Sequence, residues 1–229
     1  MWGNHLHREV VESAARIRNY QPVDRSAVRE IACDTADAGG PVERFFHDRP
    51  VFADVLTRYY TDYEPGSLWV ADCEGQVVGY LTGCFDTRRE KRVTGRRILP
   101  RVIAGAIGRG VLWHGDAWHL LAAFAGTVVL GGVPHPIDLT AYPAHFHINV
   151  REGFRGRGLG PQLVEAFMQQ ADRAGVRGIH VVTRGDNAAG RRFFEKIGFK
   201  LLFEKPLVLP AKAWFKRTST AVYGWSKER

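Results

Sequence analysis

The stretch NVREGFRGRGLG, residues 149–160, separates two segments of different periodicity and decides how the chain folds. The segment HFHINV at 145–150 leads into it and alternates between polar and apolar side chains, which predicts a half-buried strand. Apolar residues at helical spacing follow from 159 to 174 and predict an amphipathic helix. The stretch is therefore a glycine-rich loop between a strand and a helix. Its amide groups and the helix N-terminus suit an anion such as pyrophosphate.

Two common phosphate-binding motifs do not fit this loop. A Walker loop needs Lys and then Ser or Thr after its last glycine, whereas Gly160 is followed by Pro161. A dinucleotide-binding G-x-G-x-x-G fingerprint would need glycine where Pro161 stands. What does match is Arg-x-x-Gly-x-Gly, formed by Arg155, Gly158 and Gly160, with Arg157 adding charge. Taken alone, this pattern is also compatible with a plain tight turn before a helix.

A second motif stands downstream, in NAAGRRFFEKIGF at 187–199. An asparagine opens a helix, an aromatic pair and Glu-Lys follow, and Gly-Phe starts a strand. The two motifs, with one helix and one strand between them, resemble the signatures of the GNAT superfamily of acyl-CoA-dependent N-acyltransferases. AYPAHFHINV at 141–150 has a weaker likeness to the acetyltransferase-like domain of some O-GlcNAc hydrolases. The resemblance covers about residues 16–225, apart from 87–137.

The resemblance implies an α/β (α+β) fold, in which a mixed central sheet of about seven strands is splayed in the middle and flanked by helices. We treat 1–229 as a single domain of this type. Outside the motifs, periodicity and turn residues predict further elements. The expected strands are 17–20, 68–71, 76–85, 179–183, 199–209 and 214–225; the expected helices are one over 28–35 capped by Asp24 or Ser26, and one over 52–60.

Residues 87–137 form a mostly helical insertion that is basic at its start and apolar at its end. The basic run can be a solvated loop, or it can contact an acidic acyl carrier protein, the adenosine 3′-phosphate or anionic lipid. We do not expect nucleic acid, because no recognition motif accompanies the run. The apolar part either packs on the core or lines a tunnel for a long acyl chain or a hydrophobic acceptor. Its apolar stretch 117–132 is shorter than a spanning helix, so we expect no transmembrane segment.

Composition sets broader limits. The formal net charge of +8 favours polyanionic ligands without choosing among them. The cysteines Cys33, Cys73 and Cys84 lack C-x-x-C spacing, so we expect neither a zinc cage nor a disulfide framework. We expect no secretion signal, because the first residues lack a basic region followed by a long apolar run. We therefore expect a cytoplasmic protein, and its oligomeric state stays open.

By resemblance, acetyl-CoA or a longer acyl-CoA would be the co-substrate, and no metal would be needed. Backbone groups of the strand would bond the pantetheine arm and polarise the thioester carbonyl, loop amides would hold the pyrophosphate, and the asparagine of the second motif would bond the pantetheine from the other side. These positions are Ile148, Asn149 and Val150 on the strand, Arg155, Gly156, Arg157, Gly158, Leu159 and Gly160 in the loop, and Asn187.

The catalytic groups are less well specified. GNAT enzymes often carry Tyr where this chain has Phe194, and that Tyr protonates the leaving thiolate. Its loss is tolerable, because a thiol of pKa about 8.5 leaves readily near neutral pH. His145 and His147 share the polar face of the strand and are candidate bases for an amine acceptor. Either can instead be a structural group; the two can be a metal pair, for which a third ligand is not evident; and Asp138 is another candidate base.

These features lead to one principal hypothesis and two alternatives. The principal one is an N-acyltransferase that moves an acetyl or longer acyl group from CoA to a small-molecule or peptide amine by direct attack. Phe194 favours a non-catalytic acyl-CoA-binding module instead. The basic insertion also leaves open an acyltransferase that takes its acyl group from an acidic acyl carrier protein. The identity of the acceptor is not encoded in any motif.

Overall fold

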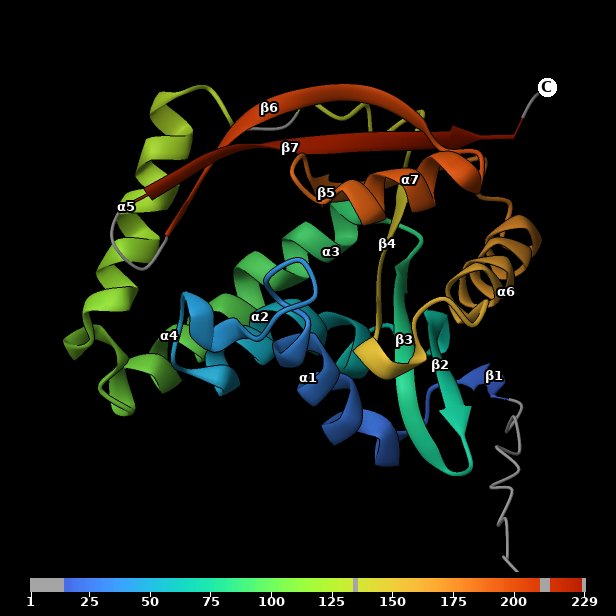
Figure 1. Cartoon of the computed structure of the whole chain (residues 1–229), viewed down its shortest axis with the longest axis horizontal. Helices are drawn as coiled ribbons and strands as arrows, with labels where there is room; N and C mark the ends of the chain where they lie inside the picture. Colours follow the sequence, from blue (N-terminus) through green and yellow to red (C-terminus); the bar gives the residue numbers. More distant parts are fainter. Residues whose placement is uncertain (1–14, 134–135, 211–214, 228–229) are drawn as a thin grey trace, which may run out of the picture.

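A computed structural model describes residues 15–133, 136–210 and 215–227. The first residues of the chain, residues 134–135 of the insertion and Trp214 at the predicted start of the last strand lie outside the described residues. Seven strands form a single sheet in the order β1-β2-β3-β4-β5-β7-β6 (Figure 1). The strands are β1 (Arg16–Asn19), β2 (Leu68–Cys73), β3 (Gln76–Cys84), β4 (Ala144–Val150), β5 (Gly178–Arg184), β6 (Lys200–Pro210) and β7 (Phe215–Ser226).

The sheet is mixed, as predicted. β4 and β5 pair in parallel, while the other neighbours pair antiparallel. The helices that accompany it are α1 (Arg25–Asp34), α2 (Arg49–Asp62), α3 (Thr87–Val93), α4 (Leu99–Gly108), α5 (Gly115–Val129), α6 (Leu159–Arg173) and α7 (Ala188–Lys196). The fold class predicted from the sequence, with its seven strands and flanking helices, is confirmed.

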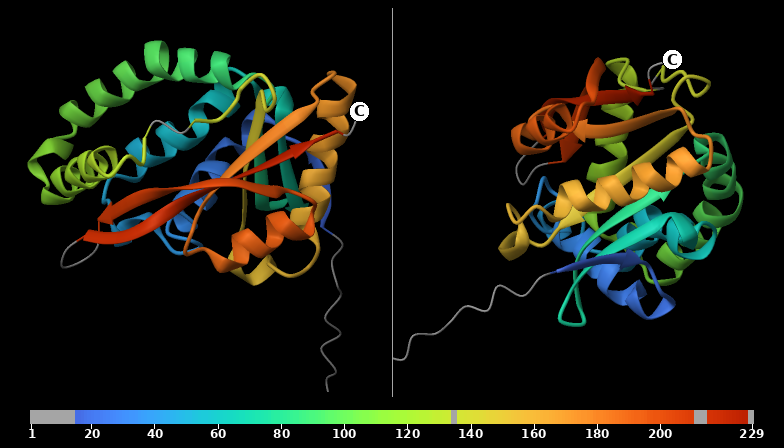
Figure 2. Two further views of the ribbon diagram at one scale, coloured as in Figure 1. Left: turned by 90° about the horizontal axis from the view of Figure 1, so that it is seen from above. Right: turned by 90° about the vertical axis from the view of Figure 1, so that its right-hand side faces the viewer.

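The two faces of the sheet are covered by different helices (Figures 1 and 2). α6 packs over β1 to β4, and α7 packs over β5 and β6. Phe146 of β4 points into this core, beside Leu163 and Phe167 of α6. α1 and α2 cover the opposite face, where Tyr60 and Tyr80 are buried. The alternation in β4 therefore separates an apolar face against α6 from a polar face against α1 and α2, as the sequence predicts.

The start of α1 differs from the prediction. Asp24 stands at the N-cap position, but no side chain caps α1, and Ser26 lies inside the helix. The Asp24 carboxylate instead accepts two hydrogen bonds from Arg18 of β1, at 2.7 and 2.9 Å, and a third from the backbone N–H of Gln21. A charge-assisted bidentate pair holds the carboxylate more strongly than a cap would, so the ion pair takes it.

The insertion leaves the sheet after β3. α3, a π-helical turn at Thr94–Ile98 and α4 follow one another, and a 3₁₀ turn at Val111–Trp113 leads to α5. α4 packs on α2, and α5 packs on β6, where Val208 N donates to Thr127 Oγ1 at 2.9 Å. Figure 1 shows α5 at the left-hand end of the molecule. Among the described residues, none of the helices has both the length and the apolar character required to cross a bilayer.

Candidate functional site

The sheet opens between β4 and β5. The described register between these strands consists of Ala144 opposite Ile179 and His145 opposite His180. Beyond His145, β4 follows β3 while β5 stays with β7 (Figure 1). The splay predicted for the middle of the sheet therefore begins at His145, and it leaves one edge of β4 without a neighbouring strand.

The pairing of β4 with β3 decides which backbone groups face this gap. Arg151 N donates to Val78 O at 2.9 Å, just past the end of the strand. Hydrogen-bonded and non-hydrogen-bonded pairs alternate in an antiparallel ladder, so Asn149 and every second residue before it turn their N–H and C=O groups toward β3. The N–H and C=O groups of Ile148 and Val150 consequently point into the gap.

Asn149 thus differs from its two neighbours. Its backbone groups face β3, and its side-chain amide donates to the Tyr80 hydroxyl at 2.8 Å. Of the three strand residues predicted to bond a pantetheine arm, Ile148 and Val150 present backbone groups to the gap. Val150 O already accepts a hydrogen bond from Arg155 Nε at 2.9 Å, so its N–H is the group left for a ligand.

The glycine-rich loop lies at the open end of the gap. Gly156 and Gly158 both have φ of +77°, a left-handed conformation that disfavours other residues. Gly158 is the N-cap of α6, and no side chain caps this helix. The first-turn N–H groups, including those of Leu159 and Gly160, lack intrahelical partners. A Cβ on Gly156 would meet no atom within 4 Å, so the space over the loop is open to an anion.

Gly160 has a different role, which is to permit close packing. A Cβ on it would lie 3.1 and 3.4 Å from the Phe193 ring of α7 and 3.9 Å from Ile148 Cδ1. The first turn of α6 therefore sits directly beside the gap and against α7. This proximity places the anion-binding amides next to the free edge of β4.

Both predicted loop arginines are exposed and take part in local contacts. Besides its bond to Val150 O, the Arg155 guanidinium lies against Gly39 in the loop between α1 and α2. The Arg157 guanidinium lies 5.1 Å from the centroid of the Phe154 ring, which is a cation–π distance. Neither arginine forms an ion pair with a described carboxylate, so no described carboxylate competes with a phosphate for either guanidinium.

Asn187 caps α7, as predicted from the sequence. Its Oδ1 accepts from Gly190 N at 3.0 Å, and its Nδ2 lies 3.3 Å from Thr183 Oγ1. The cap uses the carbonyl oxygen and Thr183 takes one amide N–H, so one amide N–H is left for a ligand. Phe194, in the same helix, is 7% exposed and packs between the rings of Phe146 and Phe199. It has no hydroxyl to offer a leaving group.

His145 is buried, and both of its ring nitrogens are hydrogen-bonded. The Thr87 hydroxyl donates to Pro143 O at 2.7 Å and can therefore only accept from His145 Nδ1, at 2.7 Å. Nε2 must then be the acceptor for the Tyr60 hydroxyl at 2.8 Å. Burial, and then the neighbouring His147 and His180, lower the pKa of His145 well below 6.5. This geometry describes a neutral histidine that joins α2 and α3 to β4.

His147 lies two residues further along the same face, at the open end of β4, and its side chain is exposed. Protein atoms crowd around it and lower its pKa to about 4, with a smaller contribution from His180. Because water reaches the ring, solvation of the charged form opposes part of this lowering. The imidazole is neutral at pH 7 and free to accept a proton.

The third histidine of the cluster is His180 on β5. Its Nδ1 lies 2.9 Å from Tyr142 O and donates to it. The ring centroid of His145 lies 5.4 Å from that of His180 and 5.7 Å from that of His147. Among the described residues, no group of three or more His, Cys, Asp or Glu side chains could hold a metal ion. Asp138, the other candidate base, accepts a hydrogen bond from Thr140 N at 2.8 Å within a turn.

The α1–α2 loop closes the other side of the site, and its role was not predicted from the sequence. Arg184, at the end of β5, forms ion pairs with Asp37 of this loop and with Asp186. Arg151, just after β4, pairs with Glu30 at 2.7 Å and with Asp34 at 3.2 Å, both on α1. These arginines hold α1 and its loop against the ends of β4 and β5.

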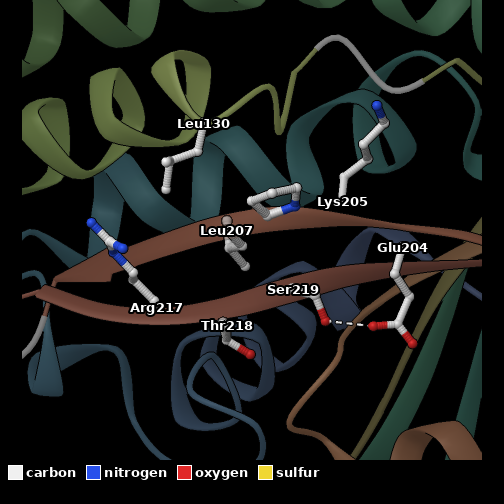
Figure 3. A pocket seen from close by; sticks show the side chains of 8 residues that line it. Leu130, Glu204, Lys205, Leu207, Arg217, Thr218 and Ser219 are labelled. Atoms are coloured by element: carbon white, nitrogen blue, oxygen red, sulfur yellow. Dashed lines mark hydrogen bonds between the residues drawn. The ribbon is translucent and has the colours of Figure 1, made fainter.

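A separate groove of about 440 Å³ runs along β6 and β7 near the end of α5 (Figure 3). Leu130 lies on its upper side in this view, and on its lower side Ser219 Oγ donates to Glu204 Oε2 at 2.7 Å. None of the loop glycines or histidines described above lines it. We therefore take the β4–β5 gap as the candidate functional site, because positive charge, free backbone groups and a neutral histidine lie together there.

Comparison with known proteins gives one family-model match and several structures with the same fold. The model of the FR47-like protein family matches residues 142–208, which contain β4, the loop, α6 and Asn187. A crystal structure of a protein named SsHAT is 25% identical, covers 94% of this chain and all of its own, and superposes with a TM-score of 0.67.

Two further structures share the fold at lower identity. YncA, a putative acetyltransferase from Salmonella typhimurium solved with its cofactor acetyl-CoA, is 15% identical over 95% of this chain and 96% of its own, with a TM-score of 0.58. The polyamine N-acetyltransferase of Drosophila melanogaster, which forms N-acetylagmatine, is 16% identical over 93% of this chain and all of its own, with a TM-score of 0.57.

Proposed function

We propose that this chain, a member of the GNAT superfamily, is an N-acyltransferase that transfers an acetyl or longer acyl group from coenzyme A to an amine. One observation carries the proposal. The free edge of β4, at Ile148 and Val150, leads directly to the anion-binding first turn of α6, and a neutral, exposed His147 lies on the adjoining polar face. An extended thioester with a pyrophosphate at one end fits this arrangement.

The binding contacts follow from the free donors and acceptors. The amides of the first turn of α6, with Arg155 and Arg157, would hold the pyrophosphate by helix dipole and charge. The N–H and C=O groups of Ile148 would bond the amides of the pantetheine arm, which would then lie along β4 as a strand does. The N–H of Val150 is a further donor on that edge.

His147 would act on the acceptor. An amine is mostly protonated at pH 7 and must lose a proton before its nitrogen can attack the thioester carbon. The neutral imidazole accepts this proton, directly or through water, and a backbone N–H of β4 stabilises the negative charge that develops on the carbonyl oxygen. The C–S bond then breaks, and CoA leaves as a thiolate. Phe194 supplies no proton, and a thiolate of pKa about 8.5 does not require one.

The acceptor would be a small-molecule or peptide amine, and its identity depends on residues that close the other side of His147. Tyr60 of α2 lies beside it, with ring centroids 6.0 Å apart, and Arg184 holds the α1–α2 loop at the end of β5. The Drosophila neighbour is named a polyamine N-acetyltransferase that catalyses the formation of N-acetylagmatine. For this chain, a panel that includes polyamines, amino acids and short peptides covers the candidates.

Because Phe194 has no hydroxyl, one alternative function is a module that binds acyl-CoA without turning it over. Two measurements separate the possibilities. Calorimetric titration with CoA tests whether the cofactor binds at the β4–β5 gap. Release of free thiol from acetyl-CoA in the presence of the amine panel tests turnover. CoA binding with no amine-dependent thiol release would favour the binding module, and absence of CoA binding would refute both functions.

A further inference from the structure

Most of the chain's excess positive charge lies in one part of the insertion. The segment Thr87–Trp113 contains eight arginine and lysine residues and one glutamate, so it supplies seven of the eight net positive charges. All eight basic side chains are exposed. They are Arg88, Arg89, Lys91, Arg92, Arg96, Arg97, Arg101 and Arg109.

These charges are also unpaired, in contrast to arginines elsewhere. Within the described part of the chain, seven of the eight form no salt bridge, and Arg109 is the exception, with Asp48. Outside the insertion, arginines such as Arg18, Arg49 and Arg184 each pair with two carboxylates. The insertion therefore presents a field of positive charge that the protein itself does not neutralise.

An apolar stripe continues this basic surface along the same helical run. Arg92 and Arg96 are four residues apart, and they are followed at helical spacing by Leu99, Ile103 and Ile107. Ile103 and Ile107 are 52% and 57% exposed. The outward side of α3 and α4 thus changes from arginine to aliphatic residues along its length, while Ile98 and Val102 face the core.

The apolar surface extends from α4 to α5 through two tryptophans. Trp113, in the turn between the helices, is 91% exposed. Trp118 of α5 donates its indole N–H to Leu112 O at 3.0 Å, which brings the start of α5 against this turn. From there, Leu121 and Val129 on α5 are exposed, and no charged residue occurs between Asp116 and the end of the helix. Such a contiguous exposed apolar area needs a partner.

We propose that Thr87–Leu130, the larger part of the insertion, is a docking surface for an anionic lipid bilayer. Arginines beside exposed tryptophan and aliphatic side chains form the pattern of helices that lie in the membrane interface. The arginines would contact lipid phosphates, and Trp113, Trp118, Ile103 and Ile107 would enter the headgroup region. The 15 residues of α5 extend about 22 Å, which suits a helix that lies on the bilayer.

The charge of the surface favours an anionic bilayer over a second copy of the chain as its partner. In a symmetric dimer the same patch faces itself, so two segments with seven net positive charges each would come together. Like charges oppose that contact, whereas an anionic bilayer neutralises them. The bilayer also accepts both the basic and the apolar parts of the surface. This inference goes beyond the proposed acyl transfer and does not depend on it.

Flotation of the full chain with vesicles tests the proposal, without acyl-CoA or acceptor. Vesicles of phosphatidylcholine alone are compared with vesicles that contain about one part in three of phosphatidylglycerol. We expect binding to the anionic vesicles and little binding to the neutral ones. Raising the salt concentration from about 0.05 M to about 0.5 M should weaken the binding at least tenfold, because dissolved ions screen the exposed arginine charges.

Two triple variants examine the two parts of the surface. Arg92→Gln/Arg96→Gln/Arg97→Gln should weaken vesicle binding on the order of a hundredfold. Its matched control removes three exposed charges from the opposite end of the molecule, Arg173→Gln/Arg177→Gln/Lys200→Gln, and should bind within a few-fold of wild type.

Ile103→Ser/Ile107→Ser/Trp113→Ser should weaken binding at least tenfold, and Val23→Ser/Leu201→Ser, which changes exposed apolar residues elsewhere, should not. Circular dichroism melts verify that each variant is folded. Failure of folded wild-type protein to float with anionic vesicles would overturn the proposal. So would equal losses in the insertion variants and their controls, or burial of the patch in a stable dimer seen by light scattering.

Discussion

His145 makes the acid sensitivity of the folded state predictable. In the folded chain its Nδ1–H donates to Thr87 and its Nε2 accepts from Tyr60, so Nε2 is the only ring nitrogen that can take a proton, and its protonation would break the bond from Tyr60. Burial, His147 and His180 together hold its pKa well below 6.5. In the unfolded chain the same imidazole titrates near 6.5. Below that pH the unfolded state binds a proton that the folded state does not, so stability is lost as the pH falls.

The magnitude follows from this linkage. Each pH unit below 6.5 costs the folded state about 1.4 kcal/mol for one such group, until the folded pKa is reached. Between pH 7 and about pH 5, His145 alone should therefore lower the free energy of unfolding by at most about 2 kcal/mol. The variant His145→Gln removes the titrating group while keeping an amide that can bond to Tyr60. It should be less stable than wild type at pH 7, yet it should lose less stability on acidification, by at most about 2 kcal/mol.

Urea unfolding followed by circular dichroism at the two pH values measures this difference directly. His147 and His180 are present in both proteins, so their contributions largely cancel in the comparison. His119→Gln, which changes an exposed histidine of α5, serves as the control and should lose as much stability on acidification as wild type. An equal loss in wild type and His145→Gln would refute the assignment of His145 as a neutral, buried hydrogen-bonding group.

Four further predictions follow from the site and the core. His147→Ala should lower turnover by about 10²–10⁴-fold with CoA affinity nearly unchanged, measured by thiol release and calorimetry; full turnover across pH would place the base elsewhere. Gly158→Asp should abolish CoA binding, whereas Gly158→Asn, with the same left-handed backbone strain but no charge, should retain much of it; equal affinities would contradict the anion site. Gly83→Ala should lower the free energy of unfolding by about 1–3 kcal/mol or more, seen in urea melts, because its Cβ would lie 2.1 Å from the Phe167 ring; wild-type stability would show that the core yields. If the insertion lines an acyl tunnel, kcat/KM should rise with acyl chain length, since each buried CH₂ contributes about 0.8 kcal/mol; a sharp preference for acetyl-CoA would remove the tunnel.

The sequence by itself determined the parts of the site that depend on near neighbours in the chain. The alternation in 145–150, the glycine-rich loop and the Asn187 cap each arise from residues a few positions apart, and the structure has all three. The two motifs together predicted the seven-stranded mixed sheet. The same local patterns predicted a cap at Asp24, which was wrong, because Arg18 pairs with that carboxylate from β1.

Only the tertiary structure decided which member of each local pattern is available for chemistry. The alternating period places His145 and His147 on one face, but it cannot show that Tyr60 and Thr87, far away in the chain, bond to both nitrogens of His145 and leave His147 open. The pairing with β3 likewise turns the backbone of Asn149 away from the gap. Burial and hydrogen-bond partners set pKa and access, and both depend on contacts between distant segments rather than on spacing within one.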